Sequence, residues 1–141
     1  MKVANKEIEQ YLYTTLGASF SDGSNTWNYF TIPPKTAVDK YVYSEVQLLG
    51  DDGTKSDFIG DYLMALTIVD RGAANFADNG PADTCASYLG NLLDVRGRQV
   101  VLSSFNLISV RLTSVEDLTD REAQQTVIIR KLIFSILAEE I

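Results

Sequence analysis

The chain has 141 residues, a net charge of −7 and 45% hydrophobic residues, which fits a single globular domain over residues 1–141 and excludes wholesale disorder. It contains no histidine and one cysteine, Cys85, which excludes an internal disulfide, a thiolate zinc site and a histidine-activated nucleophile. The negative charge repels phosphate, and the 12 Lys and Arg residues form no basic run, so a nucleic-acid-binding surface is disfavoured.

Taken in chain order, the residue pattern predicts a helix over 4–16, strands over 27–32, 41–49 and 61–70, a helix over 82–95, and strands over 106–115 and 125–139. Gly17 is expected to end the first helix. Residues 18–25 are turn formers and predict a loop. Pro33 and Pro34 close the first strand, because proline supplies no N–H to a strand ladder.

The middle of the chain predicts a hairpin. Residues 41–49 are rich in aromatic and β-branched side chains, which favour a strand. Residues 61–70 are apolar on both faces, which indicates a strand that is buried on both sides. The turn formers at 51–53 predict that these two strands are joined by a long polar connection.

The second half of the chain predicts an amphipathic helix, an acidic loop over 114–122 and an unusually long final strand. The apolar stripe of the helix consists of Ala82, Cys85, Ala86, Leu89, Leu92 and Leu93. The final strand, 125–139, exceeds the usual length of about five or six residues, so it is expected to bend or to extend past its own sheet. The expected fold is α+β, with a curved, mostly antiparallel sheet of about four or five strands and two helices packed on one face.

The carboxylates of the predicted connections were the main candidates for chemistry, and they are Asp51, Asp52, Asp57, Glu116, Asp117 and Asp120. Their spacing does not match a calcium loop, because the Asp-x-Asp-x-Asp-Gly series is absent. The glycines at 50 and 53 also lack the Lys-Ser/Thr of a phosphate-binding loop. We therefore interpret these carboxylates as solvated turn residues and expect no catalytic, cofactor-binding or metal-binding residue.

The order of these features resembles that of a known family. Pro33 and Pro34 lead into the strand that begins Tyr41-Val42-Tyr43, an amphipathic helix follows the hairpin, and an acidic turn precedes the long apolar strand over 126–136. From about residue 4 to 139, the chain is similar to the tail-terminator, or tail-completion, proteins of tailed bacteriophages. Those are small α/β domains that form rings at the head-proximal end of the tail.

The resemblance implies a structural virion protein of the neck or upper tail, with no enzymatic activity and no cofactor. It implies a homo-oligomeric ring of six or twelve copies, neighbouring portal, connector and tail proteins, and DNA that passes without specific binding. Assembly is expected in the host cytoplasm. The sequence agrees with that compartment, because residues 1–7 lack the apolar run of a signal peptide and the longest apolar stretch, 62–69, is too short to span a bilayer.

The residues expected at subunit contacts come from the hairpin connection and from the last two long strands, and they are Asp51, Asp52, Lys55, Phe58, Ile59, Arg111 and Arg130. Phe58 and Ile59 are apolar residues in an otherwise polar connection, and such a pair is expected to be buried by contact with a partner. The alternative is an ordinary hairpin in which Phe58 folds back on its own sheet.

Three other functions stay open on the sequence. One is a head-side connector or adaptor protein of the same particle. The others are a small acidic enzyme that uses Asp and Glu, and a module that binds a small ligand between sheet and helices. Oligomeric state separates the virion interpretations, which need rings, from the enzyme, which is expected to be a stable monomer with metal dependence.

We predict that millimolar calcium or magnesium leaves the melting temperature unchanged. A specific site held at 100 times its dissociation constant would add about 2.7 kcal/mol of stability, which is several degrees for a domain of this size. Thermal unfolding with and without each metal, with a chelator as the control, measures the difference. A reproducible rise of several degrees would contradict the interpretation of the carboxylates as turn residues.

Overall fold

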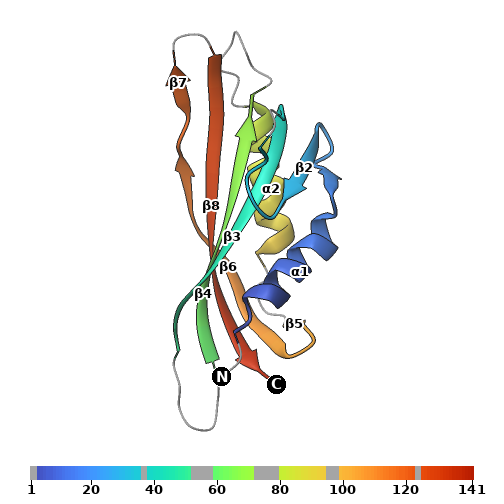
Figure 1. Ribbon diagram of the computed structural model, residues 1–141, viewed down its shortest axis with the longest axis vertical. Coiled ribbons are helices and arrows are strands. Elements are labelled where there is room, and N and C mark those ends of the chain that lie inside the picture. Colours follow the sequence, from blue (N-terminus) through green and yellow to red (C-terminus); the bar gives the residue numbers. More distant parts are fainter. Residues whose placement is uncertain (1–2, 36–37, 52–58, 72–79, 95–98, 123–124) are drawn as a thin grey trace.

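A computed structural model describes residues 3–35, 38–51, 59–71, 80–94, 99–122 and 125–141 (Figure 1). In chain order the elements are α1 (Asn5–Leu16), β1 (Ser19–Ser21), β2 (Thr26–Phe30), β3 (Lys40–Asp51), β4 (Ile59–Asp70), α2 (Gly80–Leu93), β5 (Val100–Val101), β6 (Phe105–Asp117), β7 (Asp120–Glu122) and β8 (Gln125–Glu140). Neither helix in this described part of the chain is long and apolar enough to cross a membrane.

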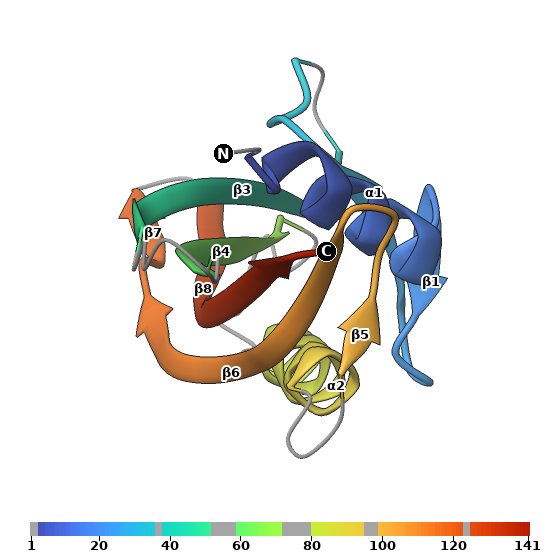
Figure 2. The ribbon, with the colours of Figure 1, turned by 90° about the horizontal axis from the view of Figure 1, so that it is seen from below.

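The strands form one sheet in the order β1-β2-β3-β4-β8-β6-β5, with β7 added to the far end of β8. All pairings are antiparallel except that of β2 with β3, so the sheet is mixed. The long strands β3, β4, β8 and β6 curve into a half-barrel, and both helices lie on its concave side (Figures 1 and 2).

The expectation of a sheet of four or five strands is wrong, because the described residues form a sheet of eight strands and are mostly β. The difference is due to short strands in segments with weak strand patterns. β1 lies in the stretch of turn formers predicted as a loop, and β7 lies in the predicted acidic loop. Both strands pair with a neighbour on a ladder, and that neighbour supplies the hydrogen bonds that their own composition does not favour.

The long elements agree with the sequence patterns. α1 and α2 begin and end within two residues of the predicted bounds, and β8 covers the predicted final strand and one more residue. The stripe of α2 is buried at Ala82, Cys85, Leu89 and Leu93. β4 is buried on both faces over Met64–Asp70, as its doubly apolar pattern predicts.

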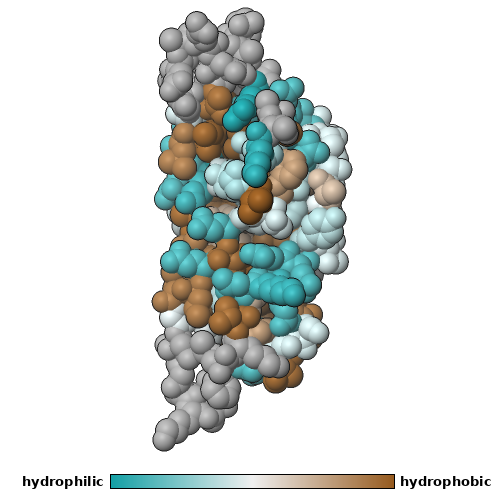
Figure 3. Space-filling view, in the orientation of Figure 1, coloured by the Kyte–Doolittle hydropathy of each residue, from teal (hydrophilic) through white to brown (hydrophobic). Residues whose placement is uncertain are grey.

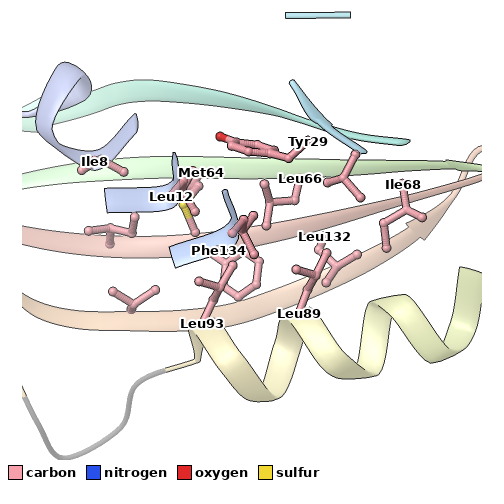
Figure 4. Close-up of a cluster of buried hydrophobic side chains, with 14 of the residues drawn as sticks. Ile8, Leu12, Tyr29, Met64, Leu66, Ile68, Leu89, Leu93, Leu132 and Phe134 are labelled. Atoms are coloured by element: carbon pink, nitrogen blue, oxygen red, sulfur yellow. The ribbon is translucent and has the colours of Figure 1, made fainter. Parts of the chain in front are cut away.

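One hydrophobic core joins the two helices to the concave face of the sheet (Figure 4). Ile8 and Leu12 enter this core from α1, and Leu89 and Leu93 enter it from α2. Between them lie the facing side chains of the central strands, which include Met64, Leu66, Leu132 and Phe134. Neither helix could bury its apolar stripe without the sheet, so the helices and the half-barrel stabilise each other.

The β1–β2 hairpin is closed by Asp22 and is tied to the main sheet through Trp27. The Asp22 carboxylate accepts hydrogen bonds from the amides of Ser24 (2.9 Å) and Asn25 (2.8 Å) and from the indole Nε1 of Trp27 (3.0 Å). Burial alone would raise the pKa of Asp22, but these hydrogen bonds hold that pKa below its ordinary value. The buried Trp27 ring in turn lies 5.7 Å below the Lys40 ammonium of β3.

We predict that Leu89→Asp unfolds the domain. Leu89 is 0% exposed in the middle of the α2 stripe, and an unpaired carboxylate there should cost several kcal/mol against a total stability of about 5–15 kcal/mol. Circular dichroism and thermal unfolding measure the effect. The control is Thr84→Asp, which places the same side chain at an exposed position of the same helix and should melt close to the parent. Equal melting of both variants would show that this part of the core is wrongly assigned.

Candidate interaction surface

The described residues offer little to bond-making chemistry. No group of three or more His, Cys, Asp or Glu within the described ranges is placed to hold a metal ion. The Cys85 thiol lies in the core, and burial raises its pKa far above its ordinary value, so the thiol stays protonated at neutral pH.

The predicted contact residues do not form one cluster in the structure. Asp52, Lys55 and Phe58 lie outside the described residues. Ile59 begins β4 and is half-buried opposite Glu139 of β8. Arg130 is opposite Ile68, nine residues further along the same ladder, which at the usual rise per residue is roughly 30 Å away. The set therefore spans most of the length of the sheet.

The two remaining predicted contact residues, Asp51 and Arg111, lie on different strands. Asp51 is the last residue of β3 and pairs with Gly60 of β4. Arg111 is exposed on β6, opposite Ser135 of β8. The Arg111 side chain is more exposed than those of Ile59 and Arg130, and its contact role stays a prediction.

Arg130 lies in an internal network and is 9% exposed. Its guanidinium Nη1 donates to Asp117 Oδ1 (2.7 Å) and to Thr119 Oγ1 (3.0 Å), and its Nε donates to Asp83 Oδ1 (3.3 Å). This network joins the end of β6 to the first turn of α2 across β8. Its role in the described chain is to hold strand and helix together from within.

The convex face of the half-barrel, which we term the outer face, is mixed in character. Leu63, Ile129, Ile133 and Leu137 are half-buried there without a helix over them, and Lys131 and Ser135 lie between them. Hydrophobic and hydrophilic residues alternate along this side of the molecule, at the left of Figure 3.

A groove of about 770 Å³ lies between α2 and the free edge of β6. Its helix wall consists of Asp83, Ala86, Ser87, Gly90, Asn91 and Asp94, and its strand wall consists of Leu112 and Val115. The two walls meet where a Cβ on Gly90 would lie 3.3 Å from Leu112 Cδ2. Figure 2 shows α2 beside β6 at this side of the half-barrel. We term this feature the α2–β6 groove.

The sequence pattern does not indicate the α2–β6 groove. Apart from Ala86, which belongs to the predicted apolar stripe, the helix residues of the groove lie outside that stripe. The sequence pattern places Val115 at the end of a predicted strand and does not indicate that one edge of this strand borders a groove. The one available signal was the run of small residues Ala86, Ser87 and Gly90 on one side of the helix, which is typical of a close approach by another backbone.

Comparison with known proteins gives a structural match only. No protein-family model matches the chain, and no curated protein matches it. Among solved structures, it is similar to a chain of the structure described as "Virion of native gene transfer agent (GTA) particle", with a TM-score of 0.62 and 20% sequence identity. The match covers 79% of this chain and 77% of that chain, so the two share a fold over most of their length.

We predict that Arg130→Met lowers stability by about 1–2 kcal/mol, because charge-assisted hydrogen bonds are lost while the side-chain stem is kept. The loss stays below that of a fully buried ion pair, because the Asp83 and Asp117 side chains are 61% and 57% exposed and can be hydrated. Urea unfolding measures the change. Arg111→Met, at an exposed arginine of β6, is the control and should change stability by less than about 0.5 kcal/mol.

Proposed function

We propose that this protein is a structural component of a phage-like virion and that it forms a ring at the neck or upper tail, between head and tail. The observation that carries the proposal is the shared fold with a chain of a gene transfer agent virion, over 79% of the present chain. The resemblance of the sequence to tail-terminator proteins supports the same class of protein.

The surfaces support an assembly role more than a chemical one. A ring requires two different patches on each subunit that meet when the copies are related by rotation. The outer face supplies a wide surface with half-buried Leu63, Ile133 and Leu137, and the exposed Leu118, whose amide donates to the carbonyl of Ile129, lies beside it. A wide surface of this kind supports one of the two patches that the proposed ring needs.

The charge of the chain agrees with a channel for DNA. A net charge of −7 on each copy gives any ring a strongly negative surface, which repels the phosphate backbone. A lining that repels phosphate lets DNA pass without binding to it. Acidic charge is common in soluble proteins, so this agreement supports the proposal without carrying it.

We predict that the purified chain forms rings of six or twelve copies. Native mass spectrometry measures the copy number, and negative-stain electron microscopy shows whether the copies close into a ring. A chain that remains monomeric at tens of micromolar, with or without the portal-side and tail-side proteins of its own particle, would contradict the ring.

The same experiment tests the contact role expected for Phe58. If Phe58 touches a neighbouring subunit, Phe58→Ser should lower the fraction of rings, because the contact loses its apolar surface. Tyr13→Ser, which removes an exposed aromatic side chain from α1, is the control and should assemble like the parent. Equal assembly of the two variants would remove Phe58 from the interface and leave the ring proposal intact.

A further inference from the structure

The half-barrel has two outer edges, which are formed by the long strands β3 and β6. β2 pairs with β3 only over residues 41–43, and β5 pairs with β6 only over residues 106–107. Over residues 45–51 of β3 and 109–117 of β6, no strand among the described residues pairs on the outer side. Unpaired strand edges present N–H and C=O groups that can pair with a strand of another molecule.

A side chain of α1 bonds the edge of β3. The carbonyl of Asp39 accepts a hydrogen bond from the amide of Arg71 (2.7 Å) and therefore points toward β4. The register with β4 continues without a break from there to Val46, so the alternation of backbone directions turns the Val46 carbonyl outward. This carbonyl accepts a hydrogen bond from Nδ2 of Asn5, the first residue of α1 (3.2 Å).

A side chain that follows α2 bonds the edge of β6 in the same manner. The amide of Leu118 donates to the carbonyl of Ile129 (3.0 Å) and points toward β8. The register shift between Leu112 and Ser114 reverses the alternation, so the amide of Leu112 points outward. This amide donates to Oδ2 of Asp94 (3.2 Å). Figure 2 shows α1 beside β3 and α2 beside β6.

The two bonded groups lie on one row of the sheet. Val46 pairs with Met64 of β4. Met64 pairs in turn with Phe134 of β8, which pairs with Leu112. A carbonyl at one edge and an amide at the other edge therefore lie at the same level along the strands, and each is bonded to a side chain from the helix at its own edge.

Without these side chains the two edges would be complementary to each other. β3, β4, β8 and β6 are each antiparallel to the next, so β3 and β6 run in opposite directions. β6 of a second copy placed beside β3 would continue the sheet as an antiparallel strand, with a strand amide facing the Val46 carbonyl. Asn5 supplies the donor, and Asp94 the acceptor, that the second copy would otherwise supply.

The Asn5 side chain is poorly explained by stability alone. Its Oδ1 is buried without a hydrogen-bond donor among the described residues, and a buried acceptor of this kind costs stability. The bond from Nδ2 to the Val46 carbonyl is what this side chain contributes in return. An asparagine that is retained with one unsatisfied atom at a strand edge fits a role in protecting that edge.

We propose that Asn5 and Asp94 are edge caps, which prevent β3 of one copy from pairing with β6 of another copy. Each edge cap occupies the backbone group that an added strand would need. The edge caps do not depend on the proposed ring at the neck, whose contacts would then be made by side-chain surfaces instead of strand edges.

Mixing two single variants tests the edge caps. Asn5→Ala uncaps β3 and Asp94→Ala uncaps β6, so a pair of uncapped edges exists only in the mixture. Sedimentation velocity with one variant labelled, at a concentration at which the parent does not assemble, should show a complex of the two variants. Association in the mixture should be at least about tenfold tighter than in either variant alone. Amide exchange should slow over residues 45–50 of the first variant and 110–116 of the second.

Two controls separate the edge caps from other effects of the substitutions. Asp94→Asn keeps a side-chain oxygen that can accept from the amide of Leu112, so this variant should not associate with Asn5→Ala. Because it lacks the negative charge, it also distinguishes the edge cap from the other interactions of the Asp94 carboxylate. Asn91→Ala removes an exposed amide side chain from α2 and should not associate with Asp94→Ala.

Three results would overturn the edge caps. These are an absence of association between the folded alanine variants, equal association of Asn5→Ala with Asp94→Asn, and amide exchange that slows only outside the two edges. A test on the parent needs no variant to fold. Its Leu112 amide should exchange more slowly than that of Val115, which also points outward, and equal exchange of the two amides would overturn the edge cap at β6.

Discussion

The antiparallel pairing of β4 with β8 is the constraint on which the rest of the structure depends. These strands are far apart in sequence, yet every residue of β4 has a partner in β8. Their pairing places Met64 beside Phe134 and Leu66 beside Leu132. These side chains belong to the core against which both helices pack. Since β3 and β6 extend the sheet on either side of this pair, the half-barrel is one continuous sheet only when β4 and β8 are paired.

The sequence predicts the parts of this fold that carry a strong periodic pattern. The stripe from Ala82 to Leu93 predicts which side of the helix is buried, and the long run of apolar and β-branched residues of β8 favours a strand. The short strands β1 and β7 could not be predicted, because turn-forming and charged residues become strands there only through pairing with a neighbour. The parallel pairing of β2 with β3 is a property of the tertiary structure and leaves no mark in either segment.

The sequence likewise predicts some features of the candidate surfaces and gives no indication of others. The sequence predicts that Cys85 lies in the apolar stripe of a helix, and the structure places its thiol in the core. It gives no indication that Arg130 lies inside the molecule, because an arginine with two acidic partners looks in sequence like any exposed arginine. The α2–β6 groove depends on the distance between a helix and a strand edge, which a sequence pattern does not encode.

The direction of the long strands has a mechanical consequence. β3, β4, β6 and β8 run along the longest axis of the molecule (Figure 1). A pull along that axis makes β4 slide against β8, so the hydrogen bonds of the ladder are loaded together and must break at nearly the same time. A pull across the sheet would instead separate neighbouring strands one bond after another, beginning at the short strands β1 and β5. The molecule is therefore expected to be stiff along its length and compliant at its margins.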